Sequence, residues 1–163
     1  MIPESYALER VEVSALSGFA GNPRTHSDPQ IKQIAASIRE FGWTNPILVD
    51  AAGTIIAGHG RLAAAKQLGL AQVPVIRLGH LSDAQRKALV IADNQLALNA
   101  GWDEAALSVL IQELDAEKFE LDILGFAADD LDRYLAGLDG VVAAEVEEGE
   151  LPEVPVTPTS QPG

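Results

Sequence analysis

The chain of 163 residues contains no cysteine, which excludes disulfide bonds and any chemistry that needs a thiolate. A chain without disulfides suits a reducing compartment, and we expect a cytoplasmic protein. The N-terminus lacks the basic and apolar segments of a signal peptide, and no apolar run is long enough to cross a membrane. The three histidines, His26, His59 and His80, have no paired ligand spacing, which argues against a zinc site.

Basic residues are scarce in the second part of the chain. Residues 100–163 hold two Lys or Arg and sixteen Asp or Glu, whereas residues 1–99 hold nine and eight. The second part therefore carries a charge of −14 and the first part +1, which together give the net charge of −13. Because a nucleic-acid backbone would repel this acidic part, we expect the chain to act on DNA only indirectly. The first part can accept an anionic ligand locally.

Length and patterning predict three segments. Residues 1–99 form a core, residues 100–138 an acidic helical extension, and residues 139–163 a proline-rich linker or disordered tail. The last prediction depends on four prolines in the eleven residues that end at Pro162. The acidic extension has an apolar stripe at helical spacing, which predicts that one face of a helix is buried; it consists of Leu107, Leu110, Ile111 and Leu114.

The core alternates between strand and helix patterns, which predicts an α+β fold. Strands are expected at 10–13, 46–49, 54–57 and 73–77, with a hairpin joining the second and third. Pro74 favours an edge strand or a strand start for the fourth. A first helix is expected to begin at Asp28, the predicted N-cap, and its apolar stripe consists of Ile31, Ile34, Ile38 and Phe41. A later helix opens on a capping box, Ser82 with Gln85.

The most informative stretch runs from Thr54 to Gly69: a short strand, a glycine corner and a short helix. Gly58 and Gly60 have no Cβ, so the backbone there can approach a ligand, and free N–H groups at the helix start favour an anion. Arg61 can add a charged fork. His59 can donate to a phosphate or act as an acid or base. The alternative is a corner that only turns the chain.

Other candidate ligands lie outside this stretch. Pro23 stiffens a loop that could aim Arg24 at the corner, and Ser37 is a candidate from the surface of the first helix. Asp93 and Asn94 interrupt the apolar pattern near the end of the helix that opens at Ser82, where they could hold a cation or a ribose. Solvated side chains are the alternative for each. No Walker-type phosphate loop occurs.

Three segments together resemble the N-terminal domain of ParB partition proteins, whose fold is shared with sulfiredoxin. They are Asn22-Pro23-Arg24, the stretch from Ile34 to Val49, and Ile56 to Gly69 followed by Val73-Pro74-Val75-Ile76; the resemblance covers about residues 8 to 99. It implies a small mixed sheet with surrounding helices and a nucleotide site.

The family's Gly-Glu-Arg-Arg corner cradles the triphosphate of CTP, and Gly58 and Arg61 match its first and last positions. His59 and Gly60 replace the other two, so one charged phosphate contact is lost. Asp93-Asn94 resembles the family's Glu-Asn pair, which implies Mg²⁺ bound with a nucleoside triphosphate. The reactive cysteine of sulfiredoxin is absent, which excludes sulfinic acid repair.

The helices after Gly101 are acidic where the DNA-reading helix-turn-helix of ParB would be basic, so we expect no such module. A closer resemblance is to the ParB-like domain that precedes a DNA methyltransferase in phage and mobile-element proteins. It implies a nucleotide-binding regulatory module, with a linked or separate methyltransferase as partner and a homodimer as one arrangement. The alternatives are a nuclease or phosphotransferase that uses His59, and an adaptor without a ligand.

Overall fold

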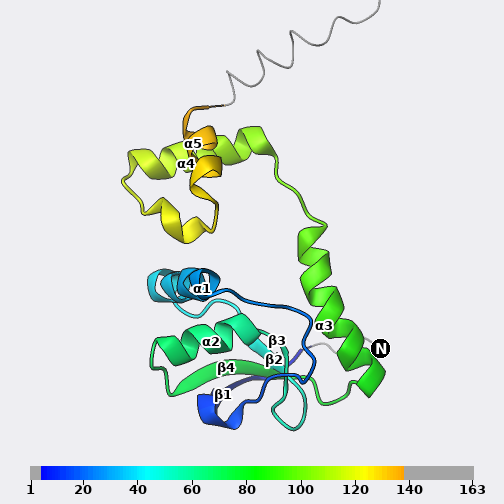
Figure 1. The fold of residues 1–163 in the computed structure, drawn as a ribbon. Coiled ribbons are helices and arrows are strands. Elements are labelled where there is room, and N and C mark those ends of the chain that lie inside the picture. Colours follow the sequence, from blue (N-terminus) through cyan, green and yellow to red (C-terminus); the bar gives the residue numbers. More distant parts are fainter. Residues whose placement is uncertain (1–4, 138–163) are drawn as a thin grey trace, which may run out of the picture.

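The computed structural model describes residues 5–137, which form a four-stranded sheet with helices on both faces and a separate group of helices beyond it (Figure 1). None of the helices in this range is long and apolar enough to cross a membrane. The elements follow in the order β1 Leu8–Glu12, η1 Val13–Ala15, α1 Asp28–Phe41, β2 Ile47–Val49, β3 Ile55–Ala57, α2 His59–Gln67, β4 Gln72–Arg77, α3 Asp83–Leu98, α4 Glu104–Ala116, η2 Leu121–Leu124 and α5 Ala128–Leu135.

The sheet is mixed, as expected for an α+β core, and its strand order is β1-β4-β2-β3. The predicted hairpin is present, because β2 and β3 pair antiparallel, while β4 runs parallel to β2 and antiparallel to β1. Of the two positions that Pro74 favoured, the edge strand is wrong, since β4 is an inner strand, while the strand start agrees with its place two residues after Gln72. Pro74 lies one residue before Val75 begins the pairing with β2, so its missing N–H interrupts no bond on that side.

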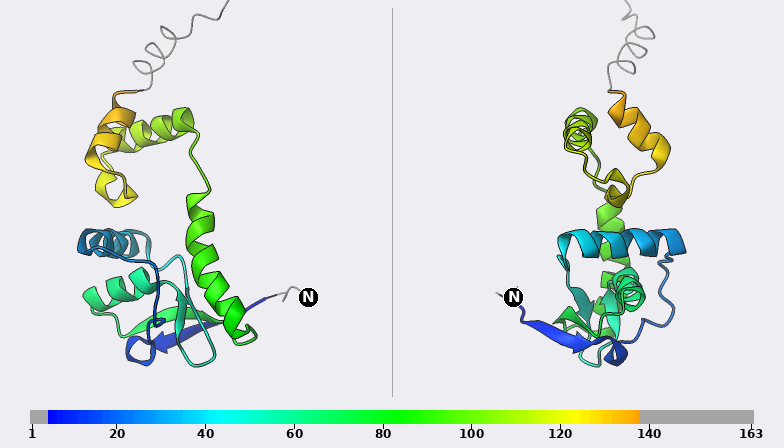
Figure 2. Two further views of the ribbon diagram at one scale, coloured as in Figure 1. Left: turned by 45° about the vertical axis from the view of Figure 1, so that its right-hand side comes forward. Right: turned by 90° about the vertical axis from the view of Figure 1, so that its left-hand side faces the viewer.

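Helices α1 and α2 cover one face of the sheet, with α2 between α1 and the strands (Figures 1 and 2). The core on this face joins Leu62 and Ala65 of α2 to branched side chains of the strands. Because these strand residues lose all contact with water, their burial supplies the main apolar contribution to stability here; they are Ile47, Val49, Ile55, Val73 and Val75, each 0% exposed.

Helix α3 packs on the opposite side of β3, where Val90 forms a small apolar cluster with Ile56 and Leu78. It begins on the predicted capping box, with Ser82 and Gln85 each accepting from the other's backbone N–H. For α1 the predicted cap is wrong by one residue, since Ser27 caps the helix and Asp28 is its first residue. The shift costs nothing, because both side chains can accept from the first turn.

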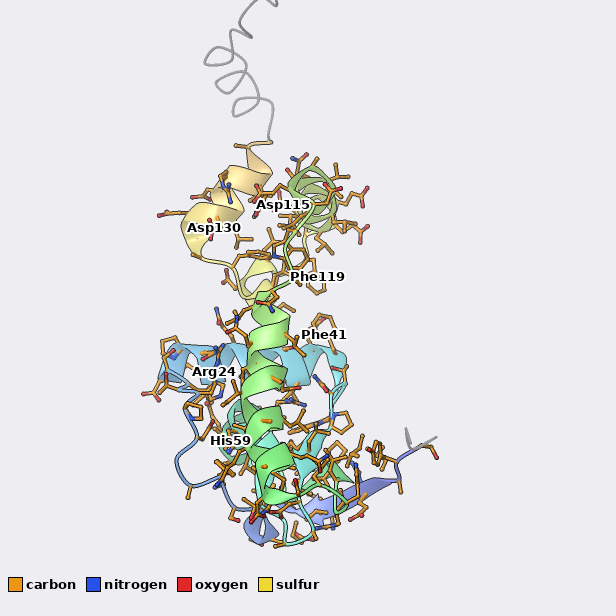
Figure 3. The ribbon with its side chains drawn as sticks, turned by 90° about the vertical axis from the view of Figure 1, so that its right-hand side faces the viewer. Arg24, Phe41, His59, Asp115, Phe119 and Asp130 are labelled. Atoms are coloured by element: carbon orange, nitrogen blue, oxygen red, sulfur yellow. The ribbon has the colours of Figure 1, made fainter. Side chains whose placement is uncertain are left out.

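Helices α4 and α5, with η2 between them, form a helical module that has its own apolar cluster: Leu107, Ile111, Leu131 and Tyr134. Leu110 was expected in this core but is 57% exposed, because Ile111 takes the inward position. Phe41 is likewise 54% exposed. It lies beyond the core contacts of α1 and stacks on Phe119, with 6.3 Å between ring centroids (Figure 3).

Candidate functional site

The glycine corner is the junction between β3 and α2. Gly58 caps α2 in a left-handed conformation, with φ 111° and ψ 24°, and no side chain caps this helix end. A Cβ at Gly58 would lie 3.0 Å from Cγ1 of Ile47, a core residue. The corner therefore needs glycine for both its backbone angle and its packing, and its first N–H groups remain without a side-chain partner.

The second glycine does not leave open space for a ligand, contrary to the simplest expectation. Gly60 is buried, and a Cβ there would lie 2.9 Å from Cδ1 of Ile34 and 3.0 Å from Cε1 of His26. The missing side chain is thus used for close packing against α1 and the preceding loop. His26 is held there by a hydrogen bond of 3.2 Å between its Nδ1 and Oε1 of Gln30.

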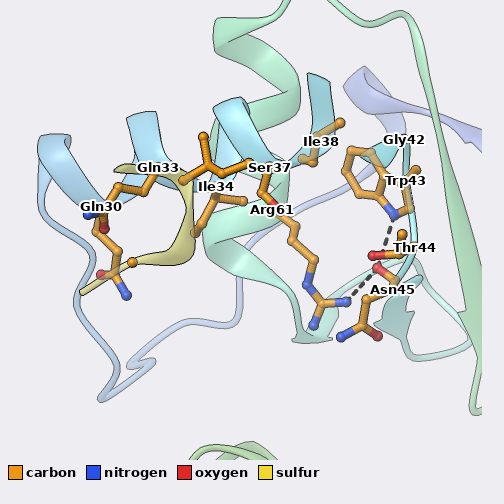
Figure 4. A pocket seen from close by; sticks show the side chains of 12 residues that line it. Gln30, Gln33, Ile34, Ser37, Ile38, Gly42, Trp43, Thr44, Asn45 and Arg61 are labelled. Carbon is orange, nitrogen blue, oxygen red and sulfur yellow. Dashed lines mark hydrogen bonds between the residues drawn. The ribbon is translucent and has the colours of Figure 1, made fainter. Parts of the chain in front are cut away.

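Arg61 projects from the first turn of α2 toward the loop that precedes β2 (Figure 4). One of its nitrogens donates to the carbonyl oxygens of Asn45 and Pro46, both at 2.6 Å. Burial lowers the pKa of Arg61, and the nearby charge of Asp93 opposes that shift. The guanidinium carbon would lie 3.4 Å from a Cβ at Gly58, so Arg61 stays beside the corner while one of its nitrogens is held by the loop.

His59 is engaged by the protein itself. The backbone N–H of Phe19 donates to its Nε2 at 3.0 Å, so the proton of the neutral ring is assigned to Nδ1. A general base needs a free lone pair, and the only acceptor nitrogen of this ring is occupied. The geometry therefore favours His59 as the residue that holds the loop carrying Arg24, rather than as a catalytic group.

We expect His59 to make stability depend on pH. Burial, and then the charge of His26, lower the pKa of His59 below 6.5, so the folded state disfavours its protonated form. This stabilisation is fully present above the unfolded pKa and is lost as pH falls from there through the lowered value. Urea unfolding between about pH 7.5 and pH 5.5 measures the loss, which His59→Gln should reduce.

Two variants check the assignment. His80→Gln replaces an exposed histidine and should keep the wild-type loss on acidification. His59→Ala leaves the N–H of Phe19 unpaired and should cost about 1–3 kcal/mol at neutral pH, more than His59→Gln, which keeps an acceptor. Equal pH slopes in wild type and His59→Gln would contradict the assignment.

Arg24 lies beside α3 together with His59 (Figure 3). Its loop is shaped by a hydrogen bond from its own N–H to Oδ1 of Asn22 at 3.1 Å. The Nε of Arg24 is buried and has no hydrogen-bond partner in the described part of the chain. A buried donor without a partner is costly, and the residue that carries it lines the cavity at the glycine corner.

Two neighbouring cavities meet at the corner. The smaller, of about 110 Å³, brings together most of the predicted ligands: Gly58, His59, Gly60, Arg61, Arg24, Asp93 and Asn94. The larger, of about 490 Å³, lies between α1, the loop before β2 and η2, and it contains Ser37 (Figure 4). Ile34 and Arg61 line both. Ser37 therefore lies in the larger cavity and not at the corner. A ligand that contacts both Ser37 and the other predicted ligands must extend from the smaller cavity into the larger one.

The predicted magnesium ligands stand on α3 at the rim of the smaller cavity. Asn94 donates its amide to the carbonyl of Val90 at 2.8 Å, which leaves its Oδ1 available, whereas Asp93 is exposed. Residues 5–137 contain no group of three or more His, Cys, Asp or Glu that could hold a metal ion alone. Two oxygen ligands fit an Mg²⁺ ion that keeps water and phosphate in its other positions.

The sequence did not reveal the residues that close the corner. Phe19, His26 and Ile34 come from the loop and from α1, and their contacts with His59 and Gly60 join residues far apart in the chain. No local spacing carries that information. The one signal in the sequence for these residues was His26, which lies two residues after the predicted ligand Arg24.

A mixed sheet with a glycine corner feeding a short helix defines the class of fold, and comparison with known proteins gives the family. The family model of the ParB N-terminal domain matches residues 3–95, and the chain belongs to this family. The model of the ParB-methyltransferase HTH domain matches residues 105–162. The expected absence of a helix-turn-helix is thus wrong, because apolar spacing and not surface charge specifies such a fold.

Two curated relatives match this chain over part of its length. The ParB-like nuclease domain-containing protein YnaK of Escherichia coli K12 is 54% identical over 72 residues, which cover 44% of this chain and 83% of that protein. The probable chromosome-partitioning protein ParB of Mycobacterium leprae is 32% identical over 120 residues, covering 66% of this chain but 36% of that protein.

The fold also matches a solved structure, that of the C-terminally truncated chromosome-partitioning protein ParB from Caulobacter crescentus complexed with CTP-gamma-S. The TM-score is 0.68 at 22% identity, over 86% of this chain and 85% of that one. This match confirms the architecture, including the small mixed sheet with its surrounding helices.

Proposed function

We propose that the chain is a nucleotide-binding regulatory module that takes a nucleoside triphosphate with Mg²⁺ at the glycine corner. The observation that carries the proposal is the buried Nε of Arg24, which has no partner among the described residues and belongs to a side chain that lines the cavity at a helix start without a side-chain cap. A phosphate oxygen would satisfy this donor and the free N–H groups together. The CTP analogue bound by the Caulobacter protein supports the same ligand class.

We assign the phosphates of the ligand to the smaller cavity and its nucleoside to the larger one. A volume of about 110 Å³ is small against the roughly 300–1,000 Å³ typical of ligand pockets, so the corner suits the phosphates alone. The adjoining 490 Å³ can receive the nucleoside, where Trp43, Asn45 and Ser37 offer a ring and polar groups. Arg61 stands at the junction, within reach of both parts.

Arg24→Gln should weaken nucleotide affinity about 10- to 100-fold, because a charged donor to phosphate is lost. Without nucleotide the same change should leave the unfolding temperature unchanged or raise it, since it removes a buried donor that has no partner. Calorimetric titration with CTP, ATP and GTP, each with and without Mg²⁺, measures the first effect, and thermal unfolding of the free protein the second.

Arg39→Gln is the matched control, since this exposed arginine lies in the last turn of α1 and away from the corner. It should keep wild-type affinity. No binding of any nucleotide by the wild type would contradict the proposed function. A free Arg24→Gln protein that is strongly destabilised would instead show that Arg24 supports the fold and not the ligand.

The proposed output is association with DNA modification, through a linked or separate methyltransferase. The match of residues 105–162 to the ParB-methyltransferase HTH domain supports this partner. Residues 101–137 hold ten Asp or Glu and two Lys or Arg, which disfavours direct contact with a phosphate backbone. We therefore propose that nucleotide binding acts on DNA through the partner.

A further inference from the structure

Asp50 is a buried acid at the end of β2, only 5% exposed, and lies outside the candidate site. Its Oδ1 accepts from the N–H groups of Ala52 and Thr54, both at 2.9 Å, which shapes the turn between β2 and β3. Its Oδ2 is paired with the guanidinium of Arg86 on α3. A buried carboxylate is stable only with such partners, so the turn and α3 are held together by this pair.

Both terminal nitrogens of the Arg86 guanidinium are held by carboxylates. Its second nitrogen donates to Asp83 in the first turn of α3, so the guanidinium is oriented by the helix that carries it. On the same face of α3, one and two steps of four residues further along, lie Val90 and Asn94. Val90 is 2% exposed and packs on Ile56 of β3, and Asn94 borders the smaller cavity.

The other apolar contact of α3 with the sheet comes from Leu89, which is partly buried against the same cluster as Val90. The helix starts beside the sheet and runs past it toward the helical module (Figure 2), and its outer residues Ile91, Leu96 and Leu98 are 60–67% exposed. The row from Arg86 to Asn94 therefore sets the rotation of α3 and its distance from β3. The other side of the cavity depends on the same turn, because β3 leads from Thr54 directly to Gly58.

We propose that Asp50 and Arg86 are a positioning pair for the nucleotide site, which holds α3 so that Asp93 and Asn94 face the corner. Neither residue touches the cavity at the corner. The proposal rests on the proposed function for its ligand, but its structural part concerns the placement of α3 and can be measured without nucleotide. It predicts that loss of the pair acts on binding only through α3.

The binding test uses Arg86→Gln. We expect Mg²⁺-nucleotide affinity about tenfold weaker or more, as for other groups that orient metal and phosphate ligands. In a background that carries both Asp93→Ala and Asn94→Ala, the same change should have little further effect, because the residues that Arg86 positions are gone. Asp50→Asn should match Arg86→Gln, since it keeps the turn acceptor but removes the charge. An effect of Arg86→Gln that is as large in this background as in the wild type would overturn the proposal.

Arg77→Gln is the matched control. Arg77 holds the same turn from the other side, through the carbonyls of Asp50 and Ala51 at 3.1 and 3.0 Å, and its side chain is 32% exposed against 29% for Arg86. It makes no hydrogen bond to α3 among the described residues. Its loss should leave nucleotide affinity within about twofold of wild type, well inside a tenfold effect.

A second readout needs no ligand. Because the chain has no cysteine, spin labels can be placed at Gln95→Cys on α3 and Lys66→Cys on α2, both exposed sites. The label-to-label distance distribution should broaden in Arg86→Gln and stay unchanged in Arg77→Gln. An unchanged distribution in Arg86→Gln overturns the positioning role. If the wild type binds no nucleotide, the proposed function fails separately, and the distance still decides whether the pair places α3.

Discussion

Gly58→Ala is expected to destabilise the protein by about 2–5 kcal/mol and to abolish nucleotide binding, through backbone strain together with overpacking. At φ 111° a residue with a Cβ is strained, and the added methyl would lie 3.0 Å from Cγ1 of Ile47. Ile47 is 0% exposed and belongs to the main core, so it has no free space to move into. Urea unfolding measures the loss, and calorimetric titration measures binding.

Gly69→Ala separates the two causes. Gly69 also has a positive φ, of 70°, but no atom lies within 4 Å of its Cβ position. Its substitution should cost about 1 kcal/mol from strain alone and leave nucleotide affinity unchanged. A Gly58→Ala protein no less stable than Gly69→Ala would contradict the packing argument. Stable Gly58→Ala with intact nucleotide binding would contradict the assignment of the corner as the site.

The corner itself could be predicted from the sequence, because its signals are local. A short apolar strand, two glycines and the arginine after them are contiguous, and the structure places Gly58 at the cap of α2 as the pattern indicates. The groups that fill the space beside Gly60 could not be predicted. His26 and Ile34 come from a loop and another helix, and only the tertiary fold brings them within 3.0 Å of that position.

The same distinction, between local signals and contacts made only in the tertiary fold, explains the errors in the predicted fold. Helix and strand existence followed from periodicity, but the sheet order did not, since it depends on which strands pair across the chain. Pro74 favoured an edge by a rule about missing donors, and the register of β4 with β2 removes that conflict. Asp50 and Arg86 have no sequence signal as a pair, because 36 residues separate them.

Acidic surface charge was a poor guide to the fold of the chain beyond residue 99. The helical module is specified by its apolar cluster, in which Ile111 is 1% exposed and Tyr134 is 3% exposed. Ser108, 3% exposed, donates to the carbonyl of Tyr134 at 2.7 Å and ties α4 to α5. Because these contacts lie within the module, we propose that it is a separate unit of stability from the core, as the division near residue 99 predicts.

Ile111→Ala should therefore unfold the helical module selectively. Truncating this side chain should cost about 2–5 kcal/mol, because its apolar contacts are lost and a cavity is left. The core should keep its stability, because the apolar cluster of Ile111 lies within the module. Other groups contact the core, among them η2 against α1 and Phe119 against Phe41. Leu110→Ala is the matched control in the same helix, and at 57% exposure it should cost less than about 0.5 kcal/mol.

The two tryptophans of the chain make the measurement direct. Trp102 contacts Phe126 of the module, with ring centroids 5.9 Å apart, and Trp43 packs against the main core. Trp43→Phe leaves a fluorescence signal from the module alone, and Trp102→Phe leaves one from the core alone. In the Ile111→Ala background the Trp102 signal should be lost at lower urea than the Trp43 signal. Coincident transitions in both backgrounds would show one cooperative unit, and the division near residue 99 would then be wrong.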